Sequence, residues 1–168
     1  MISIPGIDAI GDMTGGVMLA HRAIQQGKAM AGTLFGDVAG DYQEMSVPAN
    51  AYAYPQIVRL GLTEKQAREQ GLTAEIVKSG YGANLIARTE LMGQGFVKML
   101  FDRDRLIGVT IVGDDAADLI APMSLALANG MGKKELKRWI VPHPTLSEVL
   151  VRPSTVCRRW NTAIGSSG

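Results

Sequence analysis

The sequence predicts an α+β fold with a mostly antiparallel sheet that helices flank. Patterns typical of strands fill most of residues 49–113, and patterns typical of helices follow them up to residue 151. Strands that come first and helices that come after favour an antiparallel sheet over the parallel sheet of alternating βαβ units. A charged tight turn, Asp102-Arg103-Asp104, joins segments 95–102 and 105–113, and this pattern is typical of a β-hairpin. At 168 residues the chain is long enough for one domain with a substantial core.

The first part of the chain is expected to lie outside this sheet. Residues 1–12 are predicted to form a short extended segment that ends in Gly-Asp. Residues 17–36 carry apolar side chains at approximately helical spacing and end in a glycine, so they predict a helix. The polar stretch 37–48, which closes on Pro48, is predicted to be a linker.

Within the sheet region the strands differ in the strength of their pattern. Strands are predicted at 57–62 and 73–79, and a more weakly alternating strand is predicted at 83–89. Between the first two strands, Thr63 and Gln66 have the spacing of a capping box, which predicts the start of a short helix.

Three helices are expected after the hairpin. The first covers residues 114–130, is acidic where it begins, and ends at Asn129-Gly130. The second covers 133–139, and the third runs from Thr145 to about Val151. The sequence Arg152-Pro153 then breaks the helix.

Composition excludes several classes of protein. The net charge of +1 and two short basic clusters do not indicate a nucleic-acid partner. The longest apolar run, residues 119–128, is too short to span a bilayer and contains Pro122, and no signal peptide is expected. The single cysteine, Cys157, permits neither an internal disulfide nor a redox dithiol nor a Cys-based zinc site, so no metal is predicted. A lone cysteine also fits the reducing cytoplasm, where we expect the protein.

The stretch 141–150, VPHPTLSEVL, contains the strongest candidate for chemistry. Thr145 and Glu148 have capping-box spacing, so the glutamate could close the cap of the last helix. Alternatively, Glu148 accepts a hydrogen bond from one ring nitrogen of His143 and leaves the other nitrogen as an acid or base. Spacing by itself favours the cap.

Two further candidates lie near the N-terminus. Gly11-Asp12 precedes glycines and a helix, where free backbone N–H groups are expected; a carboxylate there suits ligand hydroxyls, as in dinucleotide folds. The alternative is that Asp12 caps a helix, and spacing by itself favours that cap. His21 has no acidic neighbour at helical spacing, so catalysis by its side chain is not expected.

Several motifs in a fixed order resemble a known family. The chain is similar to the FAD-dependent pyridine nucleotide–disulfide oxidoreductases up to about residue 151, and most similar to the dihydrolipoamide dehydrogenases among them. The motifs that carry this resemblance are IPGIDAIGD, MLAHRA, LGLTEKQAREQG, GFVKML, LIGVTIVG and HPTLSE. Two positions depart from the family pattern: Gln56 stands where Glu is usual, and Pro142 where Ala is common.

The resemblance implies a flavin site near the N-terminus. Gly11 and Asp12 match the second flavin motif, in which the aspartate binds the ribityl chain of FAD. Leu19, Ala20 and His21 match a segment whose backbone lies against the flavin ring.

The resemblance also implies a role for the last motif. His143 and Glu148 match a catalytic pair in which the histidine is the acid–base for thiol–disulfide exchange and the glutamate orients it. In the family, this histidine reaches across a twofold interface to the disulfide of the partner subunit.

The implied domain organisation has four parts. Residues 1–36 correspond to a remnant of the FAD-binding domain, 37–48 to a linker, 49–151 to the dimerisation domain, and 152–168 to a tail outside the pattern. The N-terminal FAD unit, the redox Cys-x-x-x-x-Cys and the NAD-binding domain of the family are not in these 168 residues.

These features suggest a C-terminal dimerisation and acid–base module of a dihydrolipoamide dehydrogenase-like enzyme. The parent reaction would oxidise a protein-bound dihydrolipoyl group with NAD through FAD. By itself the chain is expected to be inactive, to bind FAD weakly or not at all, and to form a homodimer. Two alternatives stay open: a non-catalytic interaction module, and one chain of a split flavoenzyme whose other chain carries the FAD and NAD domains.

Overall fold

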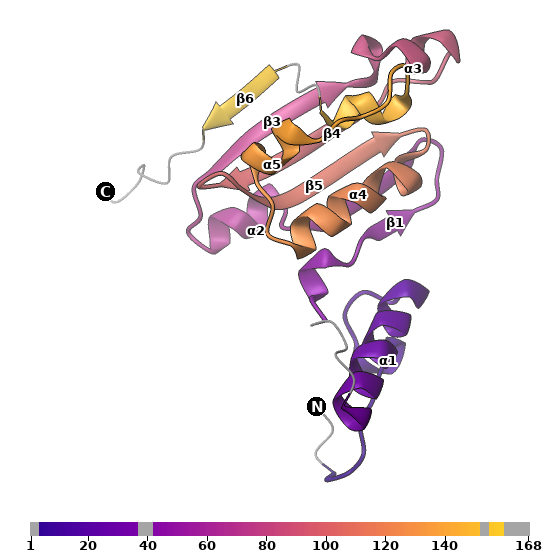
Figure 1. Cartoon of the computed structure of the whole chain (residues 1–168), viewed down its shortest axis with the longest axis vertical. Coiled ribbons are helices and arrows are strands. Elements are labelled where there is room, and N and C mark those ends of the chain that lie inside the picture. Colours follow the sequence, from indigo (N-terminus) through magenta and orange to yellow (C-terminus); the bar gives the residue numbers. More distant parts are fainter. Residues whose placement is uncertain (1–3, 37–41, 152–154, 160–168) are drawn as a thin grey trace, which may run out of the picture.

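A six-stranded antiparallel sheet forms the body of the protein (Figure 1). The structure, a computed structural model, describes residues 4–36, 42–151 and the backbone of 155–159. The strand order is β1-β2-β5-β4-β3-β6. The strands are β1 (Ala49–Ala51), β2 (Gln56–Gly61), β3 (Ala74–Gly80), β4 (Phe96–Asp102), β5 (Arg105–Gly113) and β6 (Thr155–Arg159). Every neighbouring pair is antiparallel, as the order of strand and helix patterns predicts.

The hairpin between β4 and β5 is the predicted one. Its two turn residues, Arg103 and Asp104, have positive φ angles of 45° and 78°. Two-residue turns of this kind match the right-handed twist of the strands that they join. The hairpin prediction is therefore confirmed.

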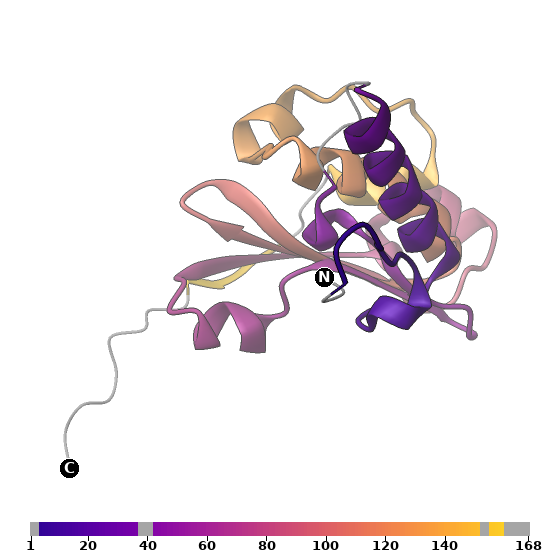
Figure 2. The same cartoon turned by 90° about the horizontal axis from the view of Figure 1, so that it is seen from below.

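Helices cover both faces of the sheet (Figure 2). One face packs against α4 (Ala116–Ala128), α5 (Lys133–Arg138) and the 3₁₀ helix η4 (Leu146–Leu150), and this side holds the larger core cluster, which includes Val58, Met123 and Val149. The opposite face packs against α2 (Glu64–Glu69), where Ala67 lies over Ile76 and Leu100. The α+β architecture is thus the one that the sequence predicts.

Helix α2 begins as expected. The Thr63 side chain accepts a hydrogen bond from Gln66 N at 3.2 Å, and Gln66 Oε1 accepts one from Thr63 N at 2.9 Å. The predicted capping box is confirmed.

One predicted strand is wrong. Residues 81–89 form a 3₁₀ turn, η3 (Tyr81–Ala83), followed by α3 (Leu85–Thr89). The Asn84 side chain accepts a hydrogen bond from Ala87 N at 3.0 Å and so caps α3. The weak alternation of this stretch was a poorer guide than its capping asparagine, because Asn competes for backbone N–H groups at helix starts.

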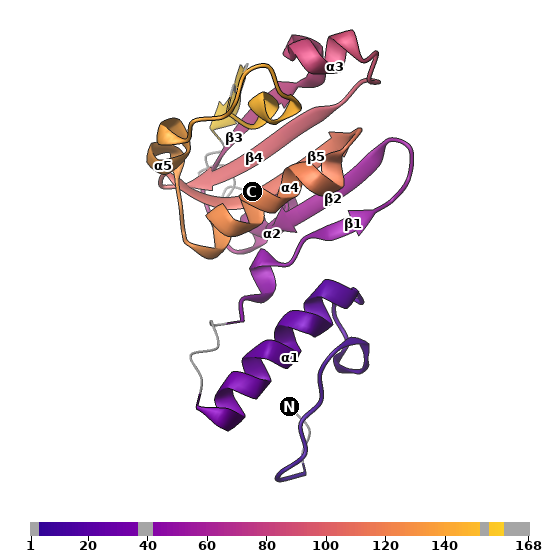
Figure 3. The ribbon, with the colours of Figure 1, turned by 45° about the vertical axis from the view of Figure 1, so that its right-hand side comes forward.

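Helix α1 (Ala20–Phe35) lies outside the sheet, beyond β1 (Figure 3). Before it, residues 4–11 pair with no strand, and the short helix η1 (Asp12–Thr14) includes the last residue of the segment predicted to be extended. After it, the part of the predicted linker that is described contains the 3₁₀ turn η2 (Glu44–Ser46). The predicted tail has only the backbone of β6 within the described residues.

Across the described residues, no helix combines the length and the apolar character needed to cross a membrane.

Candidate functional site

Two polar groups carry the predicted chemistry, and the first is the pair formed by His143 and Glu148. The loop before η4 turns so that His143 Nδ1 lies 3.0 Å from Glu148 Oε1 and 3.0 Å from Oε2. The Thr145 side chain does not cap η4 and donates instead to Pro142 O at 2.7 Å. The part of the capping-box interpretation that concerns Thr145 is therefore wrong, because its hydroxyl bonds Pro142 O and accepts nothing from the start of η4.

Burial differs strongly between the two partners. The Glu148 side chain is 7% exposed, whereas that of His143 is 60% exposed. A buried carboxylate on Nδ1 selects the tautomer that carries its proton there. Nε2 then carries the lone pair, and on this mostly exposed side chain it can take a proton from an incoming group.

A buried asparagine that sequence reasoning missed supports this pair. The Asn84 carboxamide donates to Thr145 O at 3.0 Å and to Leu146 O at 3.4 Å, so it holds the first residues of η4. Asn84 is buried and at the same time caps α3. The only sequence signal was a short polar residue before an apolar run, which predicts a cap but not its distant partner.

The second group is built around Gly11. Its N–H donates to Gln26 Oε1 at 2.8 Å, and its carbonyl accepts from Thr14 Oγ1 at 2.7 Å. Gly11 has a φ angle of 77°, and a Cβ atom there would lie 3.3 Å from Ala23 Cβ, so the loop lies close against α1 only because this residue is glycine. The next residue, Asp12, is exposed.

Asp12 caps no described helix. It is the first residue of η1, whose N-cap is Gly11, and the N-cap of α1 is Leu19. No side-chain hydrogen bond caps either helix. The interpretation of Asp12 as a helix cap is therefore wrong.

The start of α1 offers backbone donors. Leu19, the N-cap, contributes only its carbonyl, which accepts from Arg22 N at 3.1 Å and Ala23 N at 3.2 Å. The N–H groups of Ala20 and His21 come too early in the helix to have partners within it. An uncapped helix start of this kind suits a ligand carbonyl or anion.

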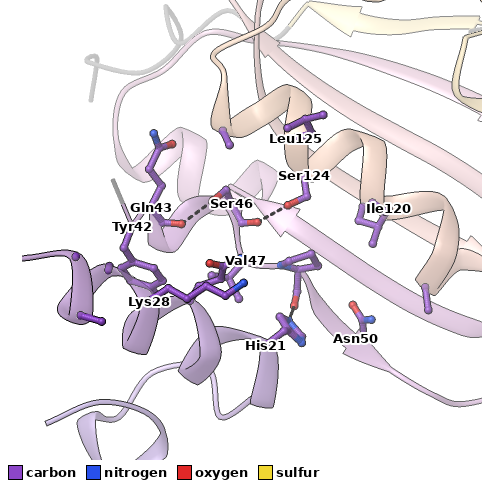
Figure 4. Close-up of a pocket in the computed structure, with 18 of the residues that line it drawn as sticks. His21, Lys28, Tyr42, Gln43, Ser46, Val47, Asn50, Ile120, Ser124 and Leu125 are labelled. Carbon is purple, nitrogen blue, oxygen red and sulfur yellow. Dashed lines mark hydrogen bonds between the residues drawn. The ribbon is translucent and has the colours of Figure 1, made fainter. Parts of the chain in front are cut away.

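His21 uses its side chain for structure. Its Nε2 donates to Pro48 O at 2.8 Å, which ties α1 to the segment that leads into β1 (Figure 4). The expectation that His21 is not an acid–base catalyst stays a prediction. A cleft of about 950 Å³ opens beside it between α1 and α4, and its walls include neither His143 nor Asp12.

A single chain does not bring the two groups together. Helix η4 packs over β3 and β4 beside α3, whereas α1 lies beyond the β1 edge of the sheet (Figures 1 and 3). The His143–Glu148 pair and the group around Gly11 therefore lie in different parts of the chain. Among the described residues, no cluster of His, Cys, Asp and Glu could hold a metal ion.

Comparison with known proteins gives a consistent result. Residues 47–153 match the family model of the pyridine nucleotide-disulphide oxidoreductase dimerisation domain. The mitochondrial dihydrolipoyl dehydrogenase of Caenorhabditis elegans is 39% identical over 148 residues, which are 86% of this chain and 30% of that protein. The dihydrolipoyl dehydrogenase of Bacillus subtilis is 34% identical over 166 residues, 98% of this chain and 34% of that protein.

Solved structures resemble the chain as well. LpdA from Mycobacterium tuberculosis matches with a TM-score of 0.80 and 26% identity, over 86% of this chain and 32% of that one. The HOCl-induced flavoprotein disulfide reductase RclA from Escherichia coli matches with a TM-score of 0.73 and 27% identity, over 84% and 33%. The chain thus spans about a third of the length of these relatives.

Proposed function

The chain belongs to the pyridine nucleotide-disulphide oxidoreductase family and carries its dimerisation domain, and from that premise we propose that it supplies the acid–base pair of a dihydrolipoyl dehydrogenase-type enzyme. The proposed reaction oxidises a dihydrolipoyl group on a carrier protein and reduces NAD. The observation that supports this most is the buried Glu148 carboxylate 3.0 Å from Nδ1 of the exposed His143. The relatives with 39% and 34% identity are dihydrolipoyl dehydrogenases by name.

The pair's part in the reaction is to move one proton. Nε2 of His143 takes the proton of a dihydrolipoyl thiol, and the resulting thiolate attacks one sulfur of the redox disulfide. The S–S bond breaks as the mixed disulfide forms, and the leaving sulfur departs as a thiolate. Glu148 stabilises the imidazolium that carries the proton meanwhile, because the carboxylate is already aligned with Nδ1.

The N-terminal residues fit one side of a flavin site. The exposed Asp12 carboxylate can accept hydrogen bonds from the ribityl hydroxyls of FAD, and Gly11 lets the loop approach closely. The backbone N–H groups of Ala20 and His21 at the uncapped start of α1, which follows the N-cap Leu19, can donate to the edge of the ring. These residues would hold FAD, which would supply the electron transfer between the dithiol and NAD.

The proposed assembly is a homodimer in which His143 of one subunit serves the flavin half-site of the other. The separation of α1 from η4 within one chain supports this arrangement. A lipoyl-bearing protein is the proposed substrate, and the cytoplasm is the proposed location, because a single cysteine fits a reducing compartment.

The exposed apolar side chains of the N-terminal part favour a neighbour that covers them. Seven large apolar side chains of this part are more than half exposed: Ile4, Ile7, Met13, Met18, Ile24, Leu34 and Phe35. A patch of this kind usually marks a contact surface. We propose that a domain with the FAD and NAD sites packs there, whether it belongs to the same polypeptide or to a separate one.

A reconstitution assay tests the function. The purified chain with added FAD should show no NADH-dependent reduction of lipoamide and no stoichiometric flavin. Turnover should appear when the FAD and NAD domains are present together with this chain, an assembly that we call the reconstituted enzyme. Those domains without this chain should be inactive. Turnover by the isolated chain, or full activity of the other domains without it, contradicts the proposal.

A further inference from the structure

Residues Glu44–Pro48, which we call the strut, are bonded to helices on two sides (Figure 4). Toward α1, Arg22 Nε lies 2.8 Å from Glu44 Oε1 and 3.1 Å from Oε2, and His21 Nε2 donates to Pro48 O at 2.8 Å. Toward α4, Ser124 Oγ donates to Ser46 O at 2.7 Å. The strut therefore connects α1 to a helix of the dimerisation domain.

Arg22 is the centre of these contacts. It is only 6% exposed although it lies in the first turn of a peripheral helix. Besides Glu44, its guanidinium donates to Thr14 Oγ1 at 3.3 Å and approaches Gly11 O at 3.5 Å. One side chain thus touches both the loop that presents Asp12 and the strut.

The charges of this pair are stabilised in the fold. The hydrogen bond to Glu44 raises the pKa of Arg22, although its burial opposes this. Burial tends to raise the pKa of Glu44, but hydrogen bonds from Tyr42 and Arg22 lower it below its usual value. The pair is therefore ionised at neutral pH, and charge-assisted hydrogen bonds of this kind are stronger than neutral ones.

Apolar packing cannot fix α1 in this position. Ile24, Leu34 and Phe35 are mostly exposed, the last of them to 84%. The cleft of about 950 Å³ remains open between α1 and α4. The orientation of α1 relative to the sheet consequently depends on the polar contacts at its first turn.

We propose that Arg22 is a positioning residue for the flavin half-site. Through Glu44 and the strut it sets the orientation of α1 and of the Gly11-Asp12 loop relative to the dimerisation domain. This inference rests on the proposed function, because it concerns the same flavin site. Arg22 acts through the loop and the helix and does not itself need to touch the cofactor.

Spin labels on the isolated chain test whether Arg22 and Glu44 set the orientation of α1 relative to the sheet. Cys157→Ser removes the single cysteine, and Lys28→Cys on α1 with Gln70→Cys after α2 then provide two exposed labelling sites. A narrow distance distribution is expected in this background. Arg22→Gln and Glu44→Gln should each broaden it, and the exchanged pair Arg22→Glu with Glu44→Arg should narrow it again.

Matched controls separate positioning from general loss of stability. Lys65→Gln removes an exposed ion pair with Glu69 and should leave the distribution unchanged. The midpoint of thermal unfolding of the sheet should be the same in all variants. If Arg22→Gln fails to fold, Glu44→Gln still tests the proposal, because its side chain is half-exposed and its replacement disturbs the fold less. Unchanged distributions in both single variants overturn the proposal.

Flavin binding by the reconstituted enzyme, which contains this chain and the FAD and NAD domains, tests whether Arg22 affects the flavin site. Arg22→Gln should weaken the Kd for FAD roughly tenfold, as expected for loss of a charged hydrogen-bond network, and Lys65→Gln should not change it. Equal FAD affinity of wild type and Arg22→Gln overturns the positioning role but leaves the proposed function intact. Failure of the wild type to bind FAD contradicts the proposed function itself, and the flavin role of Arg22 fails with it.

Discussion

At the scale of single residues, the Glu148 carboxylate is buried and has both oxygens on one imidazole nitrogen. Sequence spacing predicted a capping box here, since Thr145 and Glu148 stand three positions apart. Spacing could not show that the loop from Pro142 to Thr145 brings the ring of His143 over the carboxylate. The family resemblance favoured the contact between His143 and Glu148 that the structure shows, whereas the spacing by itself favoured the cap.

Replacement of Glu148 by Gln tests how much the carboxylate contributes. The variant keeps the size of the side chain and one acceptor oxygen but cannot stabilise an imidazolium by charge. We expect kcat for dihydrolipoamide oxidation by the reconstituted enzyme to fall by about 100-fold, which is the lower end of what acid–base groups contribute. Steady-state kinetics check this, and a kcat within twofold of wild type would show that the carboxylate has no part in proton transfer.

Asn84→Ala tests the support beneath η4. The substitution leaves Thr145 O without its buried donor and removes the cap of α3. We expect the free energy of unfolding in urea to fall by about 1–3 kcal/mol, the usual cost of an unsatisfied buried group. Asn129→Ala is the matched control, because that asparagine is exposed and bonds only within its own helix turn, so its effect should be much smaller.

At the scale of elements, the strongly alternating strands and the hairpin were predictable, whereas α3 was not. Strands β4 and β5 carry long regular patterns, and their turn is two residues long. The stretch that forms η3 and α3 has few residues and no clear period, so its structure depends on Asn84 and on Tyr81, both buried by distant parts of the chain. Tertiary contacts of this kind leave no local signal.

Tyr81 gives these elements a pH dependence. Its ring is fully buried between Gly95 and Gly113, and its hydroxyl donates to Asp114 O at 2.7 Å. Burial, with a smaller effect of Asp114 and Asp115, raises the pKa of Tyr81 well above its ordinary value. The neutral phenol therefore stabilises the fold below pH about 10, the pKa in the unfolded chain, and this stabilisation is lost as pH rises above it.

Tyr81→Phe tests whether ionisation of Tyr81 causes the expected loss of stability at high pH. The variant lacks the ionisable group, so its free energy of unfolding should fall less steeply than that of the wild type between pH about 10 and 11. Urea unfolding at several pH values in this range measures the slopes. Parallel slopes would contradict the prediction, and Tyr52→Phe, at an exposed tyrosine, provides the matched control.

At the scale of the whole molecule, the two groups that we propose as half-sites lie in different parts of the chain. The residues proposed to face the flavin lie at and before α1, which lies beyond the β1 edge of the sheet (Figure 1). Helix η4, which carries Glu148, packs on β3 and β4. The sequence could suggest both groups through the family resemblance. The resemblance also implied that His143 reaches a partner subunit, and the distance between the two groups within one chain follows from the strand order of the sheet.

Self-association follows from this arrangement. The isolated chain should form a dimer at micromolar concentration, because the dimerisation domain of its family is present and apolar side chains such as Leu125 are exposed. Light scattering during size-exclusion chromatography measures the molar mass. A monomer throughout the micromolar range would contradict the expected dimer.

The central claim is that His143 moves the proton of the thiol–disulfide step. Two half-reactions of the reconstituted enzyme test it most directly: reduction of the flavin by NADH and reduction of the flavin by dihydrolipoamide. In His143→Gln, NADH should still reduce the bound flavin at the wild-type rate, because that step needs no proton from the dithiol. Reduction of the flavin by dihydrolipoamide in a stopped-flow experiment should slow by at least about 100-fold. A dihydrolipoamide half-reaction as fast as that of the wild type would contradict the account.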